Sequence, residues 1–318
     1  MRKRVAEMTP ARERCLSIST SNILENFPVL EELLEDHRLI LLLDYDGTLT
    51  PIVSDPAQAL LNEEVRATLR ELPKHYITGV VSGRSLAKIR RFVDVDGLFY
   101  AGSHGFDIFT PLQPWYEVGA GRGGQDILEE QTDEGGPGRR YKVANEFLPV
   151  LQQMRAEVEE AIANIAGAEV EDNVYSVSVH YRNCRREDVP KVTAAVEGAQ
   201  KKQEGIRIRT GKEVYELQPC IKWDKGAAVV WLLDMLGLTE EAGSDNVFTV
   251  FIGDDKTDED AFKVFNGLHD KGKQPGLGIL VSEESRETNA AFTLRNPLQV
   301  AMFLSRLVEI GRERSLEP

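Results

Sequence analysis

Short runs of aliphatic residues alternate along the chain with stretches in which apolar residues recur every three or four positions. The aliphatic runs each end in polar residues and lie at 39–44, 77–82, 97–104, 247–255 and 276–282. Runs without polar alternation are typical of strands buried on both faces of a parallel sheet. The amphipathic stretches predict helices at 62–72, 85–93 and 225–238. This order predicts an α/β fold with a doubly wound parallel sheet, which binds ligands beyond the carboxyl ends of its strands.

The pattern changes between residues 142 and 218. A long amphipathic helix starts near Asn145, and a strand at 174–182 carries apolar residues on one face and polar residues on the other. A helix at about 188–203 and a hairpin at 206–218, turning at Gly211–Lys212, complete the region. We expect a small α/β insertion over the sheet.

These patterns divide the chain into five segments. We expect a flexible N-terminal extension (1–21), a first part of the core (22–118), a mobile linker loop rich in Gly and charge (119–141), the α/β insertion (142–218) and a second part of the core (219–318).

Composition narrows the function classes. The 318 residues carry a formal net charge of −14, which disfavours nucleic acid as the main partner because a phosphate backbone attracts a basic face. We find no apolar run long enough to span a membrane, and no histidine or cysteine pattern with zinc-ligand spacing. Few, widely separated cysteines fit a reducing compartment. We expect a cytoplasmic monomer, and the basic N-terminus leaves organellar targeting open.

The stretch LLLDYDGTLT places Asp44 and Asp46 directly after an aliphatic run. Two carboxylates beside a Gly-Thr turn can chelate a hard cation, and Mg²⁺ prefers carboxylate and water oxygens. A calcium loop would need Glu at its twelfth position, but that position holds Asp55. We therefore favour a magnesium site over a calcium loop.

A second acidic cluster, GDDKTDED at 253–260, follows another aliphatic run. Alone, it would be typical of a solvated helix start. Two such clusters at the ends of two strands of one sheet favour a shared metal. Between them, Ser82 follows a strand and Lys225 begins a helix, and both residue types can bind phosphate oxygens.

These four motifs, in this order, resemble those of the haloacid dehalogenase superfamily of phosphatases. More narrowly, the chain resembles the plant-type trehalose-6-phosphate phosphatase family over roughly residues 22–310, in the stretches LDYDGTLTPIV, VVSGRS, YAGSHGFDI, NEFLP, VSVHYR, IKWDKG and IGDDKTDEDAFKV. The resemblance implies a Rossmann-like core with a cap inserted between the second and third motifs. It also implies Mg²⁺-dependent hydrolysis of trehalose 6-phosphate to trehalose and phosphate.

The resemblance assigns a role to each motif residue. Asp44 would be the nucleophile that forms an aspartyl phosphate, and Asp46 the general acid and base. Lys225 would be catalytic and bind phosphate. The remaining assignments are Thr48 and Ser82 for the phosphoryl oxygens, Asp44, Asp254 and the Asp46 carbonyl for the metal, Asp255 and Asp258 for contacts around the metal, and Arg84, His104, Glu171, Arg182, Lys212 and Glu216 for the substrate.

Other interpretations stay open at this point. The same core could act on sucrose phosphate or phosphorylated hexoses. A sensor that binds a sugar phosphate but barely turns it over is a different class, and the intact Asp44, Asp46, Lys225 and Asp254 count against it. For Glu171 and Lys212, solvated surface charge is the alternative to substrate binding.

Overall fold

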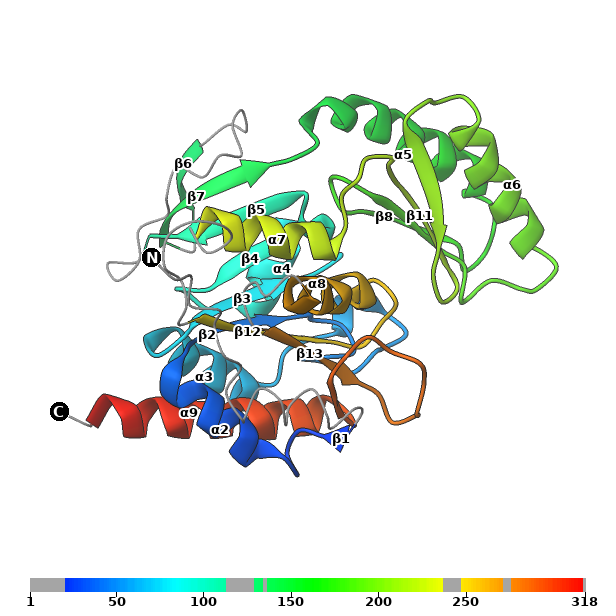
Figure 1. Ribbon diagram of the computed structural model, residues 1–318. Helices are drawn as coiled ribbons and strands as arrows, with labels where there is room; N and C mark the ends of the chain where they lie inside the picture. Colours follow the sequence, from blue (N-terminus) through cyan, green and yellow to red (C-terminus); the bar gives the residue numbers. More distant parts are fainter. Residues whose placement is uncertain (1–20, 113–128, 134–135, 237–246, 271–275, 317–318) are drawn as a thin grey trace.

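The computed structural model describes residues 21–112, 129–133, 136–236, 247–270 and 276–316. They form a ten-stranded sheet of order β1-β14-β13-β12-β2-β3-β4-β5-β7-β6 and, to one side of it, a four-stranded sheet of order β10-β11-β9-β8 (Figure 1). The strands are β1 (Ser21–Asn22), β2 (Arg38–Leu43), β3 (Ile77–Val81), β4 (Phe99–Gly102), β5 (Asp107–Pro111), β6 (Glu129–Asp133), β7 (Gly136–Lys142), β8 (Glu169–Asp172), β9 (Val177–His180), β10 (Ile206–Thr210), β11 (Val214–Pro219), β12 (Val247–Gly253), β13 (Gly276–Val281) and β14 (Phe292–Leu294). The helices are α2 (Phe27–Asp36), α3 (Glu63–Glu71), α4 (Leu86–Val93), α5 (Leu148–Ile162), α6 (Val189–Gln200), α7 (Lys225–Met235), α8 (Asp258–Asp270) and α9 (Pro297–Leu316).

The large sheet is parallel from β1 to β4 in its spatial order, and β5, β7 and β6 are antiparallel. The five strands expected from the aliphatic runs are β2, β3, β4, β12 and β13. The expected doubly wound α/β fold class is therefore confirmed.

Helices cover both faces of the large sheet (Figure 1). We call the large sheet and these helices the core. Leu39, Leu41 and Leu43 of β2 join the buried cluster that includes residues of α2, α3, α4 and α9, whereas Ile40 and Leu42 join the cluster with α7 and α8. Each such side chain stabilises the fold by roughly 1.5–3 kcal/mol when fully buried. Burial on both faces explains why the strand is aliphatic at every position.

The prediction of a linker loop at 119–141 is wrong for residues 129–133 and 136–141, which the structure describes. β6 and β7 form an antiparallel hairpin that adds to β5 at the edge of the large sheet. The Arg140 guanidinium donates to both carboxylate oxygens of Asp107, at 2.7 and 2.6 Å, and the Asp107 side chain is 1% exposed. Gly and charge suggested a loop, but backbone pairing and this buried ion pair stabilise a strand. Residues 119–128 lie outside the described part.

Residues 142–218, called the insertion below, contain the four-stranded sheet with α5 and α6. Both helices pack on one face of that sheet around a hydrophobic cluster of their own. The expected hairpin at 206–218 is confirmed as β10 and β11. β9 begins later than expected because the Tyr175 N–H donates to the Asn173 carbonyl at 2.8 Å in a turn before it. β8 was not expected.

The expected N-terminal extension lies outside the described residues except for Ser21, which pairs with Phe292 in β14. Among the described helices, none has both the length and the apolar composition needed to cross a membrane.

Candidate active site

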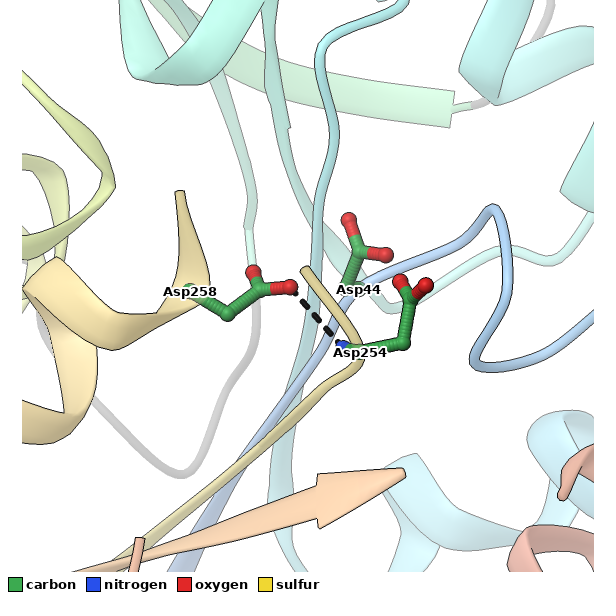
Figure 2. A group of neighbouring side chains, drawn as sticks. All are labelled: Asp44, Asp254 and Asp258. Carbon is green, nitrogen blue, oxygen red and sulfur yellow. Dashed lines mark hydrogen bonds between the residues drawn. The ribbon is translucent and has the colours of Figure 1, made fainter. Parts of the chain in front are cut away.

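The ends of β2 and β12 bring the two acidic motifs together. The two strands are parallel neighbours, and the Asp44 N–H donates to the Ile252 carbonyl at 2.8 Å, one hydrogen bond beyond the end of β2. Asp44 therefore lies beside Asp254, which follows β12 directly. Figure 2 shows the two carboxyl groups side by side.

Gly47 allows the first motif to approach the second. Its φ is +82°, and a Cβ at this position would lie 2.3 Å from Asp254 Oδ2. Any side chain would therefore collide with Asp254, besides being strained at this φ. The Gly of the D-x-D-G-T motif is explained by this close contact.

Lys225 joins the two motifs from a third element. Asp224 caps α7 by accepting a hydrogen bond from the Ala227 N–H at 2.8 Å, which fixes the helix start and hence Lys225 as its first residue. Lys225 is 3% exposed, and its Nζ donates to Asp44 Oδ1 and to Asp258 Oδ1, each at 2.7 Å. This buried ammonium lies between the two carboxylates.

Asp258 supports the site from the first turn of α8. Its Oδ2 accepts hydrogen bonds from the Asp254 N–H at 2.9 Å and the Asp255 N–H at 3.0 Å. Figure 2 shows the bond to Asp254 as a dashed line. Both oxygens of Asp258 thus have partners, and the side chain holds the turn that carries Asp254.

Negative charge accumulates at this point. Burial raises the pKa of Asp44 to about 8; Lys225 opposes the rise, and repulsion from Asp254 and Asp255 adds to it. Burial also raises the pKa of Asp254 to about 7, and repulsion from Asp258 and Asp255 adds to that shift. The carboxylates therefore need more positive charge than Lys225 supplies to stay ionised together.

A metal ion fits this donor set. One carboxylate oxygen from each of Asp44, Asp254 and Asp258 lies within 4.8 Å of the others. Such oxygens are the ligands that hard divalent cations prefer. Because Asp258 is already engaged by Lys225 and two backbone N–H groups, Asp44 and Asp254 are the better candidates for direct ligands. The predicted role of the Asp46 carbonyl as a metal ligand stays a prediction.

Two hydroxyls that follow neighbouring strands of the sheet, those of Thr48 and Ser82, are candidate partners of a phosphate group. The Thr48 hydroxyl is fully buried, and the described residues offer it no hydrogen-bond partner. Ser82 follows β3, the strand next to β2, and its Oγ accepts from the Arg84 N–H at 3.1 Å, leaving its proton to donate. Unpaired buried hydroxyls are costly, so a ligand or water oxygen is expected there.

Arg84 holds Asp46 by two charge-assisted hydrogen bonds, of 2.7 Å from Nε and 2.6 Å from Nη2. The Arg84 side chain is 8% exposed and that of Asp46 is 39% exposed. Asp46 is therefore partly open to solvent, whereas Asp44 is buried. This contrast is consistent with one carboxylate facing the phosphorus and the other facing the departing group.

Two substrate candidates of the insertion meet the core. Glu216 Oε1 lies 3.5 Å from His104 Nε2, and Glu171 Oε1 accepts from Lys88 Nζ at 2.8 Å. His104 itself is 7% exposed, with its ring against Gly83. Glu171 and Glu216 thus lie at the interface between insertion and core.

The other two candidates of the insertion lie elsewhere. Arg182 pairs with Glu213 at 3.0 Å and donates to the Lys212 carbonyl at 3.2 Å, in the β10–β11 turn. Lys212 is exposed. The contacts of Arg182 thus stay within the insertion, and a substrate role for it or for Lys212 stays a prediction.

Sequence reasoning missed several polar residues on the face of the small sheet opposite its helices. Arg207 pairs with Gln218 in the register of β10 and β11, and Ser176 lies directly before β9; each has a buried polar atom without a partner among the described residues. Lys88 and His180, which contact Glu171, were missed as well. No spacing in the sequence pointed to Lys88, because Arg84 lies before the helix that carries Lys88.

Comparison with known proteins decides the family. A family model described as trehalose-phosphatase matches residues 42–297. The chain is 37% identical over 303 residues to probable trehalose-phosphate phosphatase G of Arabidopsis thaliana, covering 95% of this chain and 77% of that protein. The chain belongs to the trehalose-phosphatase family.

Solved structures agree on the fold of this trehalose-phosphatase family member. The C-terminal domain of trehalose-6-phosphate phosphatase from C. albicans superposes with a TM-score of 0.70 at 23% identity, over 92% of this chain and 99% of that one. A haloacid dehalogenase-like hydrolase from Bacteroides thetaiotaomicron gives a TM-score of 0.52 at 18% identity, over 85% and 99%. The predicted resemblance to the trehalose-phosphatase family is therefore confirmed, and the chain is a phosphatase whose fold is that of a haloacid dehalogenase-like hydrolase.

Proposed function

We propose that this phosphatase hydrolyses trehalose 6-phosphate to trehalose and phosphate, with Mg²⁺ as cofactor and an aspartyl phosphate on Asp44 as intermediate. The observation that carries the proposal is the meeting of Asp44, Lys225 and Asp254 around one point. The Thr48 hydroxyl, four residues after Asp44, is buried and has no partner among the described residues, which supports it. Family membership supports the choice of substrate.

In the first step, an oxygen of Asp44 attacks phosphorus, and the bond from phosphorus to the sugar oxygen breaks. Asp46 protonates the departing sugar oxygen. In the second step, Asp46 takes a proton from water, the water oxygen attacks the phosphorus of the aspartyl phosphate, and the Asp44 carboxylate leaves. Arg84 orients Asp46 through its two hydrogen bonds.

Lys225, Thr48 and Ser82 bind the phosphoryl oxygens in this proposal. When bound at Asp44 and Asp254, Mg²⁺ would keep both carboxylates ionised and neutralise charge on the phosphoryl group. The high pKa values of the two carboxyl groups without a metal support this need. We place the Asp46 carbonyl among the metal ligands, and Asp255 and Asp258 around them.

We also propose that the insertion acts as a cap over the core, with the boundaries given above. Its separate hydrophobic cluster and its polar face toward the core support this. Glu171 and Glu216 would accept hydrogen bonds from sugar hydroxyls, and His104 and Arg84 would complete the pocket from the core.

A cytoplasmic monomer remains part of the proposal. The free thiols of Cys184 and Cys220 support a reducing compartment.

Phosphate release from trehalose 6-phosphate, sucrose 6-phosphate and glucose 6-phosphate, measured side by side with Mg²⁺, tests the function. We expect kcat/KM to be highest with trehalose 6-phosphate. A higher kcat/KM with sucrose 6-phosphate or glucose 6-phosphate would mean that the proposed substrate is wrong. Tight binding of trehalose 6-phosphate without turnover would favour a sugar-phosphate sensor over an enzyme.

A further inference from the structure

Lys88 contacts the insertion from the core. It lies on α4, and its Nζ donates to Glu171 Oε1 at 2.8 Å and to the Asp172 carbonyl at 3.2 Å, both in β8. A second contact is the hydrogen bond from the Ser103 hydroxyl to the Asn173 carbonyl. The core thus binds the backbone at Asp172, the last residue of β8, and at Asn173, the next residue.

The position of Lys88 on its helix connects it to the chemical site. It lies in the first turn of α4, whereas Arg84 precedes the N-cap Ser85, and the Glu171 carboxylate that binds Lys88 also helps to raise the pKa of Arg84. Arg84 holds Asp46, and Lys88 holds Glu171. A line of alternating charge therefore runs from the candidate acid and base to the candidate sugar contact.

Glu171 is anchored on both of its oxygens. Lys88 binds Oε1, and His180 Nε2 lies 3.1 Å from Oε2. Burial acts to raise the pKa of Glu171, but the hydrogen bonds with His180 and Lys88 lower it to about 2. The carboxylate is thus ionised and fixed in orientation, and each oxygen keeps a lone pair for a further donor.

We infer that Lys88 is a positioning residue for substrate recognition: it holds Glu171 and the end of β8 over the Asp46 side of the site, without touching the phosphoryl group. The inference rests on the proposed function for its substrate. An ion pair between fully exposed side chains contributes little, because water and salt screen it. Lys88 differs because its side chain is 33% exposed, that of Glu171 is 21% exposed, and the ammonium also binds backbone.

The test compares Lys88→Met with Lys88→Arg and a matched control, Lys74→Met. Lys74 pairs with Glu71 at 2.6 Å on the core surface, before β3 rather than after it. We expect Lys88→Met to lower kcat/KM for trehalose 6-phosphate by about 10-fold or more, mainly through KM, as loss of a charged hydrogen-bond partner does. With p-nitrophenyl phosphate, which carries no sugar, the change should stay within about 2-fold, and Lys88→Arg should restore most of the loss.

A double variant tests whether Lys88 acts through Glu171. If it does, Lys88→Met with Glu171→Gln should lose no more than Glu171→Gln alone. Losses that multiply, or equal losses with both substrates in Lys88→Met, would overturn the inference.

Hydrogen exchange provides a readout that needs no turnover. In the substrate-free enzyme, Lys88→Met should speed the exchange of the β8 amides, whereas Lys74→Met should not. Unchanged exchange together with unchanged KM would overturn the role of Lys88 and leave the proposed function intact. If wild type failed on trehalose 6-phosphate, the proposed function would fail, and faster exchange in Lys88→Met would still support the contact.

Discussion

The strand-end site of the core and the polar face of the insertion place their charges in different ways. In the core, Asp44, Asp258 and Lys225 are almost fully buried and contact one another within one sheet and its helices. On the insertion, Glu171 and Glu216 each have side chains 21% exposed; Glu171 binds the ammonium of Lys88 from the core, and Glu216 lies 3.5 Å from the His104 ring of the core. The difference indicates that the topology of the sheet builds the chemical site, whereas recognition depends on how two parts of the chain dock.

The largest effect should come from the nucleophile. Asp44→Asn keeps the size of the side chain but removes the charge that attacks phosphorus, so turnover should fall by several orders of magnitude with every substrate. Rapid quench with labelled substrate should trap phosphate on wild type and none on the variant.

A suitable control is Asp55→Asn, because Asp55 accepts a backbone N–H from Ala57 and Asn can do the same. It should keep wild-type turnover. Substantial turnover by Asp44→Asn would refute the aspartyl-phosphate mechanism.

Removal of divalent ions should have the next largest effect. A chelator should abolish activity, Mg²⁺ should restore it, and Ca²⁺ should restore it poorly because its coordination shell is larger and more flexible. Circular dichroism should show no unfolding, since the hydrophobic clusters on both faces of the sheet do not depend on the metal. Full activity of the metal-free enzyme would leave the acidic cluster without its proposed role.

The smallest effect concerns acid stability of the insertion. The folded pKa of Glu171, about 2, lies below the ordinary value of 4.5, so its stabilising contribution is complete above pH 4.5 and is lost as the pH falls toward 2. We expect the difference in free energy of unfolding between wild type and Glu171→Gln to shrink by roughly half between about pH 6 and about pH 3. Urea unfolding at both pH values measures it. A difference that does not change with pH would mean that Glu171 does not carry the ion pairs described.

The same contrast explains what the sequence could predict. The aliphatic runs fixed the parallel strands, and parallel strands bring their carboxyl ends to one edge, so the proximity of Asp44 and Asp254 followed from pattern alone. The contact of Lys88 with Glu171 could not be predicted from the pattern, because it depends on the register of β8 against β9 and on how the insertion docks on the core. The strand β7 was missed because Gly and Arg in its sequence have no strand periodicity; pairing with β5 and the Asp107 ion pair decide its conformation.

The central claim is that chemistry and recognition are separable. Measuring kcat/KM of Glu216→Ala with trehalose 6-phosphate and with p-nitrophenyl phosphate tests it most directly. Glu197→Ala is the control, because Glu197 is an exposed carboxylate of the insertion that pairs with Lys201 instead of the core. We predict a loss of about 10- to 150-fold with trehalose 6-phosphate, little change with p-nitrophenyl phosphate, and no loss in the control. Equal losses of Glu216→Ala with both substrates would contradict the account.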